Sequence, residues 1–407
     1  MEKYAGIDIA KKIHWMCVTD AEGRFLMEPR PYANDAEGLS RMVADLDLYG
    51  GDVAVGMEST GCYWRSCYKV LAEGGYPVSV INPVKTCAER RQGNLGRAKT
   101  DRVDCLVIAD TLRKQGIPPT PSPDADAAQL RDLCRFRRTV SESLSRAKIQ
   151  AVALLDQVWP EYPRLFSNTF CAASLAVLRA VCDSEVGLLD RSVYDLAPAL
   201  FAASRGRYSE AKAAEVRDSA RSTCGIAPTP ALRLQLRLLL DQVSFHEGQI
   251  AGIDVEADAL LDAVAPTLPT VPGIGRATAA QIAAEVGDAT RFRDAKALVA
   301  YAGLDPTRRQ SGGFDPDRNR ISKRGSAHLR RSLYIAAQAS LRADCEFRDF
   351  YDRLRGRGYS HRYAVCAVAR KMLCVCWALM RSGEEYSWDR HRARGKAPEG
   401  ASPVDAG

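Results

Sequence analysis

The chain has 407 residues, of which 46% are apolar and 26% charged, and it carries a formal net charge of +7. This length indicates a globular protein of two or three domains. No apolar stretch approaches the roughly 20 residues that span a bilayer, and the start lacks a signal-peptide pattern, so we expect a soluble, cytoplasmic protein without a membrane partner. The 13 cysteines are scattered without paired CxxC sets, which favours reduced thiols over zinc sites or disulfides.

The first part of the chain predicts an α/β domain. The expected elements are strands at residues 4–9, 15–19 and 24–28, a helix at 36–48, a strand at 53–58, a helix at 63–72, a strand at 78–82 and a helix at 101–114. Three strands that lead into alternating helices and strands give a mixed sheet covered by helices, which is the order of ribonuclease-H-like domains. A proline-rich stretch at residues 117–123 predicts a linker, so this domain should cover residues 1–122.

The remainder is expected to be mostly helical. Apolar residues recur at helical spacing at residues 127–159 and 231–264, which fits either a coiled-coil arm or an ordinary helical bundle within residues 123–265. Residues 266–382 are expected to form an α-helical C-terminal domain. The polar residues 383–407 predict a disordered tail.

Four acidic residues fit a metal site in the first domain. Asp8 lies in an apolar strand, where an isolated carboxylate is unfavourable, and Glu58 ends another strand. Asp101 and Asp104 are three residues apart in an expected helix and share one face. Such carboxylates hold two Mg²⁺ ions, or Mn²⁺, about 3.5–4 Å apart in phosphodiester chemistry. Each acid alone also fits a helix-end or solvated charge. The first strand also fits actin-like ATPases, although the sequence shows no second phosphate loop.

Two features of the C-terminal domain predict contact with nucleic acid. Residues 308–331 hold eight Lys/Arg and two Asp, which favours a polyanion, although a solvated basic surface is the alternative. Residues 271–279 predict a helix-hairpin-helix that grips a nucleic-acid backbone, or else a tight turn between packed helices. The candidate contact residues are Gly273, Gly275, Arg276, Arg308, Arg309, Lys323, Arg324, Arg330 and Arg331.

Ser311 lies in a glycine-rich loop surrounded by cations. A serine hydroxyl there can attack phosphorus if its proton is removed and the developing charge is met by arginines or metal. A Ser-Gly-Gly triplet is more often only a turn. The residues alone therefore leave the nucleophile open.

Together these motifs resemble the DEDD insertion-sequence transposases of the insertion sequence one-ten (IS110) family. The resemblance spans nearly the whole chain and rests on motifs in a fixed order: Gly6-Ile7-Asp8-Ile9-Ala10, Glu58-Ser59-Thr60-Gly61, Lys99-Thr100-Asp101-Arg102-Val103-Asp104, Pro272-Gly273-Ile274-Gly275, Tyr301-Ala302-Gly303-Leu304, Gln310-Ser311-Gly312 and Ile321-Ser322-Lys323-Arg324-Gly325. It implies a RuvC-like N-terminal domain whose catalytic acids, Asp8, Glu58, Asp101 and Asp104, bind Mg²⁺. It also implies that Ser311 is the nucleophile and forms a serine-phosphate link to DNA.

The same resemblance implies several partners. These are donor and target DNA, a structured bridge RNA encoded by the element, and further copies of the chain in a dimer or tetramer joined through a helical arm. It also implies a prokaryotic protein that associates with the nucleoid when it acts. Two rival functions remain open: a Mg²⁺-dependent nuclease for branched DNA in which Ser311 is structural, and a non-enzymatic nucleic-acid-binding protein.

Overall fold

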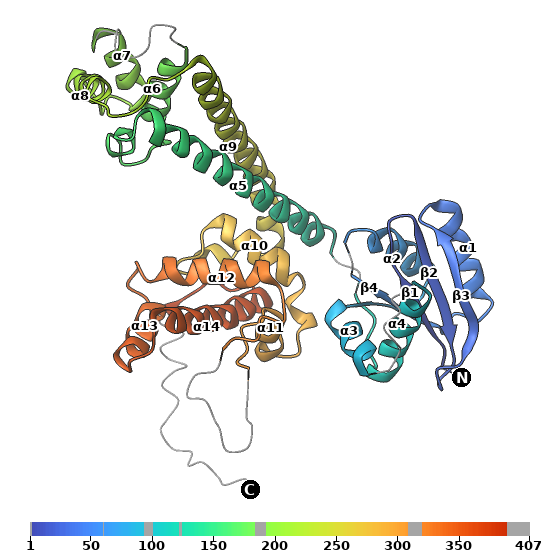
Figure 1. Ribbon diagram of the computed structural model, residues 1–407. Helices are drawn as coiled ribbons and strands as arrows, with labels where there is room; N and C mark the ends of the chain where they lie inside the picture. Colours follow the sequence, from blue (N-terminus) through green and yellow to red (C-terminus); the bar gives the residue numbers. More distant parts are fainter. Residues whose placement is uncertain are drawn as a thin grey trace, which may run out of the picture. The chain divides into compact units, whose positions relative to one another are not determined.

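The structure is a computed structural model that describes residues 2–59, 61–92, 101–121, 124–183, 193–307 and 320–388. The chain divides into two compact units, Met1–Ser122 and Pro123–Gly407 (Figure 1). The two units have separate apolar cores.

The first unit is built on a five-stranded mixed sheet with the strand order β3-β2-β1-β4-β5. The strands are β1 (Tyr4–Asp8), β2 (Ile13–Thr19), β3 (Phe25–Ala33), β4 (Ala54–Glu58) and β5 (Val78–Ile81). Strands β1, β2 and β3 are antiparallel, whereas β1, β4 and β5 run parallel. The predicted α/β class, with a mixed sheet of ribonuclease-H-like strand order, is confirmed.

Strand β3 is longer than the sequence predicted, because it continues past residue 28 through Pro29 and Pro31 to Ala33. Proline has no backbone N–H to donate, so it is excluded from central strands but tolerated at the edge of a sheet. Strand β3 is the edge strand, and its Pro31 pairs with Trp15 of β2.

Helices cover both faces of the sheet. Their bounds are α1 (Ala36–Asp47), α2 (Trp64–Glu73), α3 (Pro83–Gln92) and α4 (Asp101–Gln115). One face of the sheet packs in the main core of this unit with α1 and α2. The other face is covered by α4, through Cys105, Ile108 and Leu112 among others. No helix was predicted at α3, although Pro83 occupies its first position, which is typical of a helix start.

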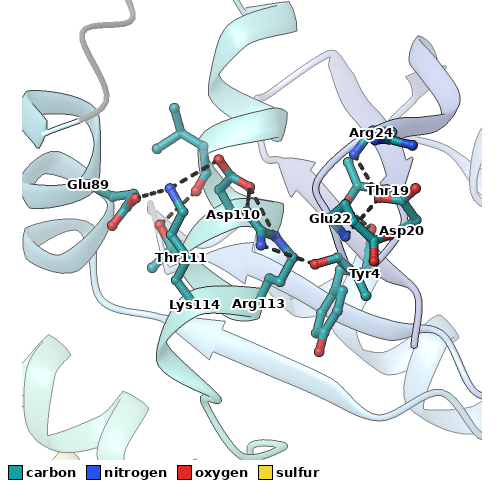
Figure 2. Close-up of polar contacts among 12 residues, drawn as sticks. Tyr4, Thr19, Asp20, Glu22, Arg24, Glu89, Asp110, Thr111, Arg113 and Lys114 are labelled. Atoms are coloured by element: carbon teal, nitrogen blue, oxygen red, sulfur yellow. Dashed lines mark hydrogen bonds and ion pairs between the residues drawn. The ribbon is translucent and has the colours of Figure 1, made fainter. Parts of the chain in front are cut away.

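Ion pairs fix the C-terminal end of α4 (Figure 2). The Asp110 carboxylate forms ion pairs with both Arg113 and Lys114. Lys114 also forms an ion pair with Glu89 of α3, at 2.6 Å. The Arg113 guanidinium donates to the carbonyl of Ala21 in the turn between β2 and β3. These contacts tie α4 to both the sheet and α3, and the opposite end of α4 carries two of the predicted metal ligands.

Apart from loops and one isolated β-bridge, the described residues of the second unit are helical. Its α-helices are α5 (Ala125–Val158), α6 (Ala172–Asp183), α7 (Val193–Ala203), α8 (Glu210–Arg221), α9 (Pro230–Val264), α10 (Arg276–Val286), α11 (Ala295–Tyr301), α12 (Ala327–Ser340), α13 (Glu346–Gly356) and α14 (His361–Ser382). Short 3₁₀ turns occur at Tyr162–Arg164, Leu268–Thr270 and Ala289–Arg291. The prediction of a mostly helical remainder is confirmed.

Helices α5 and α9 lie side by side as a long antiparallel pair (Figure 1). The start of α5, with Leu130, shares a core with Leu261 near the end of α9. The end of α5, with Leu155, shares a second core with Leu236 near the start of α9. The pair therefore connects two separate cores: one contains α10 to α14, and the other contains α6 to α8.

Helix α14 is the one helix in the described part of the chain that is long and apolar enough to cross a membrane, by length and composition alone. Half of its most apolar 18-residue window is buried within the structure, where Val368 and Met372 are fully enclosed. A core helix passes the same test. The sequence-based expectation that no apolar stretch approaches the roughly 20 residues that span a bilayer overlooked α14, which has 22 residues.

Candidate functional site

Two of the predicted acids end neighbouring parallel strands. Asp8 is the last residue of β1 and Glu58 the last residue of β4, each one residue beyond the paired Ile7 and Met57. Ile7 and Met57 point into the core that contains α1 and α2. Since side chains alternate along a strand, Asp8 and Glu58 both face the other side of the sheet, which α4 covers.

Gly6 allows α4 to approach this side of the sheet closely. A Cβ at Gly6 would lie 2.0 Å from the carbonyl oxygen of Cys105 and 2.5 Å from the backbone nitrogen of Ala109. The pKa of the Cys105 thiol is raised, chiefly by its hydrogen bond with Cys17 and by burial, and also by the negative charge of Asp8. Asp8 is therefore near Cys105, which follows Asp104 on α4.

Helix α3 supplies partners for two of the other acids. The Arg90 guanidinium forms an ion pair with the buried carboxylate of Asp104, with 2.5 Å between Nη2 and Oδ1. The Thr86 hydroxyl donates a hydrogen bond to Glu58. Neither Arg90 nor Thr86 was predicted, because the sequence pattern did not reveal α3. Asp101 is the first residue of α4, and its side chain lies outside the described part of the structure.

The chemistry of these side chains fits a hard divalent cation, because carboxylate oxygens are the ligands that Mg²⁺ prefers. Among the described side chains, no three His, Cys, Asp or Glu groups lie close enough to share an ion. Asp104 instead has the Arg90 guanidinium as its cation. The four-acid metal site therefore remains a prediction.

The glycine turn before α10 is explained by helix packing. Gly273 has φ +88°, and a Cβ there would lie 2.5 Å from both the Ala336 carbonyl oxygen and the Ser340 nitrogen of α12. Arg276 turns back to α9, where it lies 2.9 Å from the carboxylates of both Asp258 and Asp262. These contacts favour the tight turn between packed helices, and the helix-hairpin-helix is not confirmed.

Ser311, Arg308 and Arg309 lie in residues 308–319, outside the described part of the structure. The two flanks of that segment are held together. Pro306 and Ile321 form an antiparallel bridge, and the nitrogen of Thr307 donates to the carbonyl of Arg320 at 2.7 Å. The segment that carries the predicted nucleophile therefore starts and ends on a paired stem.

Two glycines fix the path of the chain around this stem. A Cβ at Gly325 would lie 2.0 Å from the carbonyl oxygen of Tyr301, and Gly303 has φ +65°. The Arg330 guanidinium donates to the carbonyl of Ala302 at 3.0 Å, so it serves this packing. The predicted contact residues that are exposed here are Lys323, Arg324 and Arg331.

A buried carboxylate anchors the residues after the stem. Glu285 of α10 is fully buried and receives hydrogen bonds from Arg135 of α5, at 2.9 and 3.2 Å, and from the Ser326 hydroxyl at 2.8 Å. Ser326 also caps the N-terminus of α12. Burial opposes ionisation of Glu285, but the hydrogen bonds and charge of Arg135, with the Ser326 hydroxyl, outweigh it and lower its pKa. No sequence pattern had pointed to this group.

Two family models match the chain. A DEDD transposase model of the IS110 type matches residues 5–160, and a model described as "Transposase IS116/IS110/IS902 family" matches residues 265–352. Together they cover more than half of the chain. The chain belongs to the IS110 family of transposases.

Similar proteins extend over nearly the whole of this transposase. It is 26% identical to "Insertion element IS110 uncharacterized 43.6 kDa protein" of Streptomyces coelicolor, covering 94% of this chain and 95% of that one. It is 22% identical to the "Pilin gene-inverting protein" of Moraxella lacunata, covering 94% and 97%. Among solved structures, T. thermophilus RuvC in complex with a Holliday junction substrate is 17% identical, with a TM-score of 0.23, covering 30% of this chain and 100% of that one.

Proposed function

We propose that this transposase moves an insertion sequence by cutting and rejoining DNA at the side of its sheet that α4 covers. The observation that carries the proposal is the placement of Asp8 and Glu58 at adjacent strand ends on that side, with Asp104 on α4. Asp8, Glu58, Asp101 and Asp104 would hold two Mg²⁺ ions, or Mn²⁺. When bound, Mg²⁺ would offset the negative charge of the phosphate under attack.

Ser311 is the nucleophile in this proposal. Its hydroxyl loses a proton as its oxygen bonds to the scissile phosphorus, and the departing DNA oxygen leaves with a proton. The serine-phosphate ester keeps the energy of the phosphodiester bond, so a hydroxyl of a second DNA strand rejoins by the reverse step without ATP. The paired stem at Pro306 and Ile321 supports this role, because it fixes both ends of a segment whose interior must reach DNA.

The expected partners are donor DNA, target DNA and a structured bridge RNA. The support is electrostatic, since Lys323, Arg324 and Arg331 are exposed and follow Ser311 by 12 to 20 residues. A guide RNA would supply the sequence specificity for which the chain shows no base-reading motif. The protein would then act in the cytoplasm of a prokaryotic cell, on the nucleoid.

An exposed face of α9 supports assembly into dimers or tetramers. Leu234, Leu238, Phe245 and Val255 are between 47% and 70% exposed on the helix that pairs with α5. They recur at intervals of four, seven and ten residues, which places them along one side of α9. A second copy of the chain that packs on this side would bury them.

Asp104→Asn tests the proposed metal site directly. The variant should still fold and bind DNA but fail to cut it in Mg²⁺, because a neutral amide is a poor ligand for a hard cation. Asp101→Asn should behave in the same way. Asp52→Asn, which makes the same change at an exposed position of the first unit, is the matched control and should cut at the parental rate. Cutting by Asp104→Asn at the control rate would overturn the proposal.

A further inference from the structure

Helices α5, α10 and α12 line an open pocket of about 170 Å³ that the proposed cutting site does not use. Its polar lining comes from all three helices. The polar groups include Arg137, Arg138, Thr278, Gln281, His328 and Arg331. Among the described residues, no carboxylate lines the pocket.

The lining is rich in hydrogen-bond donors. The Nε2 amide of Gln281 is buried and has no hydrogen-bond partner among the residues that the structure describes. The Arg138 guanidinium, which can only donate, lies 3.2 Å from Nδ1 of His328, so this nitrogen is the acceptor. Burial lowers the pKa of His328, which favours the neutral ring with its proton on Nε2. A buried donor without a partner is costly, and an acceptor from outside the chain would satisfy it.

The positive charge at the pocket is only partly neutralised. Arg137 is paired with Asp254 of α9, and Arg138 with Glu142 on its own helix. Arg331 is exposed, and its charge, after that of Arg138, helps to lower the pKa of Glu142, so three arginines at the pocket face two carboxylates. No carboxylate belongs to the lining itself, so a ligand in the pocket meets hydrogen-bond donors and the positive charge of three arginines.

We propose that this pocket binds a phosphodiester group of a nucleic-acid strand. A phosphodiester carries a negative charge and presents only acceptor oxygens, which complements an acid-free lining of guanidinium, amide and imidazole donors. The inference rests on the proposed function, which gives the protein nucleic-acid substrates. The sequence predicted nucleic-acid contacts only at the glycine turn and residues 308–331. The pocket adds α5 and Gln281 to that interface. The strand is DNA or RNA, which share this chemistry.

Gln281→Glu tests the pocket, because it replaces the unpaired amide with a carboxylate of nearly the same shape. Binding is measured on the full chain over a series of salt concentrations, with a DNA duplex of mixed sequence and a single-stranded RNA as separate probes, each about 20 nucleotides long, which exceeds the site size of a single binding module. Gln281→Met removes the donor without adding charge. Gln242→Glu makes the same charge change at an exposed position of α9 and is the control.

Gln281→Glu should lower the affinity for at least one probe by about tenfold or more, because a hydrogen bond to a charged group is lost and charge repulsion is added. The slope of log affinity against log salt should fall by about 0.9 for duplex DNA or 0.7 for single-stranded RNA. Gln281→Met should weaken the same probe by a smaller factor, and the probe affected identifies the strand. If both Gln281 variants match Gln242→Glu on both probes, the pocket binds no phosphodiester. If the parent protein binds neither probe, the nucleic-acid function itself fails.

Discussion

Replacing Glu285 with glutamine should destabilise the second unit, because it removes the charge from a buried ion pair. Breaking a fully buried pair costs about 3–5 kcal/mol. Here Glu285 is 0% exposed but Arg135 is 45% exposed, and Arg135 can turn to solvent when its partner is neutral. We therefore expect a loss of about 2 kcal/mol, below the fully buried value because solvent screens the arginine. For a unit of this size the loss lowers the unfolding midpoint by about 4–8 °C.

Thermal unfolding by circular dichroism at pH 7 measures this shift, with Glu142→Gln as control. Glu142 pairs with Arg138 at an exposed position, so its neutralisation should leave the midpoint unchanged within error. The pKa of Glu285 is lowered in the folded state, so its contribution is present above its unfolded pKa of about 4.3 and is lost as the pH falls further. The difference in unfolding midpoint between the parent and Glu285→Gln should therefore become smaller below about pH 4. A midpoint difference that stays constant from pH 7 to pH 3, or equal midpoints for parent and variant, would refute this reasoning.

Three further predictions concern the other sites. Gly6→Ala should lower the free energy of unfolding of the first unit by about 1–3 kcal/mol or more, measured by thermal unfolding, because the added Cβ would clash with the backbone of α4. Arg90→Met should raise the Mg²⁺ affinity of the DNA-free protein about tenfold in calorimetry, since the guanidinium no longer occupies Asp104, and an unchanged affinity would show that Arg90 does not compete. Replacing Lys323 and Arg324 with glutamine should weaken binding evenly across DNA sequences and lower the salt slope by about 0.9 per lost phosphate contact, whereas a defect at one base position would contradict backbone contact.

The fold of the first unit was predictable because its signals are local. Alternating apolar residues located every strand, although they missed the extension of β3 through Pro29 and Pro31, which depends on its place at the sheet edge. Helix α3 was missed because it has no clear apolar face, and its packing depends on the sheet. The omission mattered, since Arg90 and Thr86 lie on it.

The positions of two of the predicted acids were predictable from the sequence, but their contacts were not. The placement of Asp8 and Glu58 at strand ends follows from the strand pattern, and the structure places both on the side of the sheet that α4 covers. The contact between Arg135 and Glu285 joins residues 150 positions apart, which no local spacing reveals. The pattern around Gly273 is equally compatible with backbone gripping and with packing against α12, and only the tertiary contact separates them.

Covalent trapping tests most directly whether this transposase joins DNA to itself through Ser311. The protein is incubated in Mg²⁺ with a nicked DNA substrate that carries a labelled strand, denatured, and separated by electrophoresis before peptide mapping. We expect a protein–DNA adduct on the peptide that contains Ser311, lost in Ser311→Ala while DNA binding is retained. An adduct on Ser322 or Ser326, or efficient strand exchange by Ser311→Ala, would contradict the serine-linked mechanism.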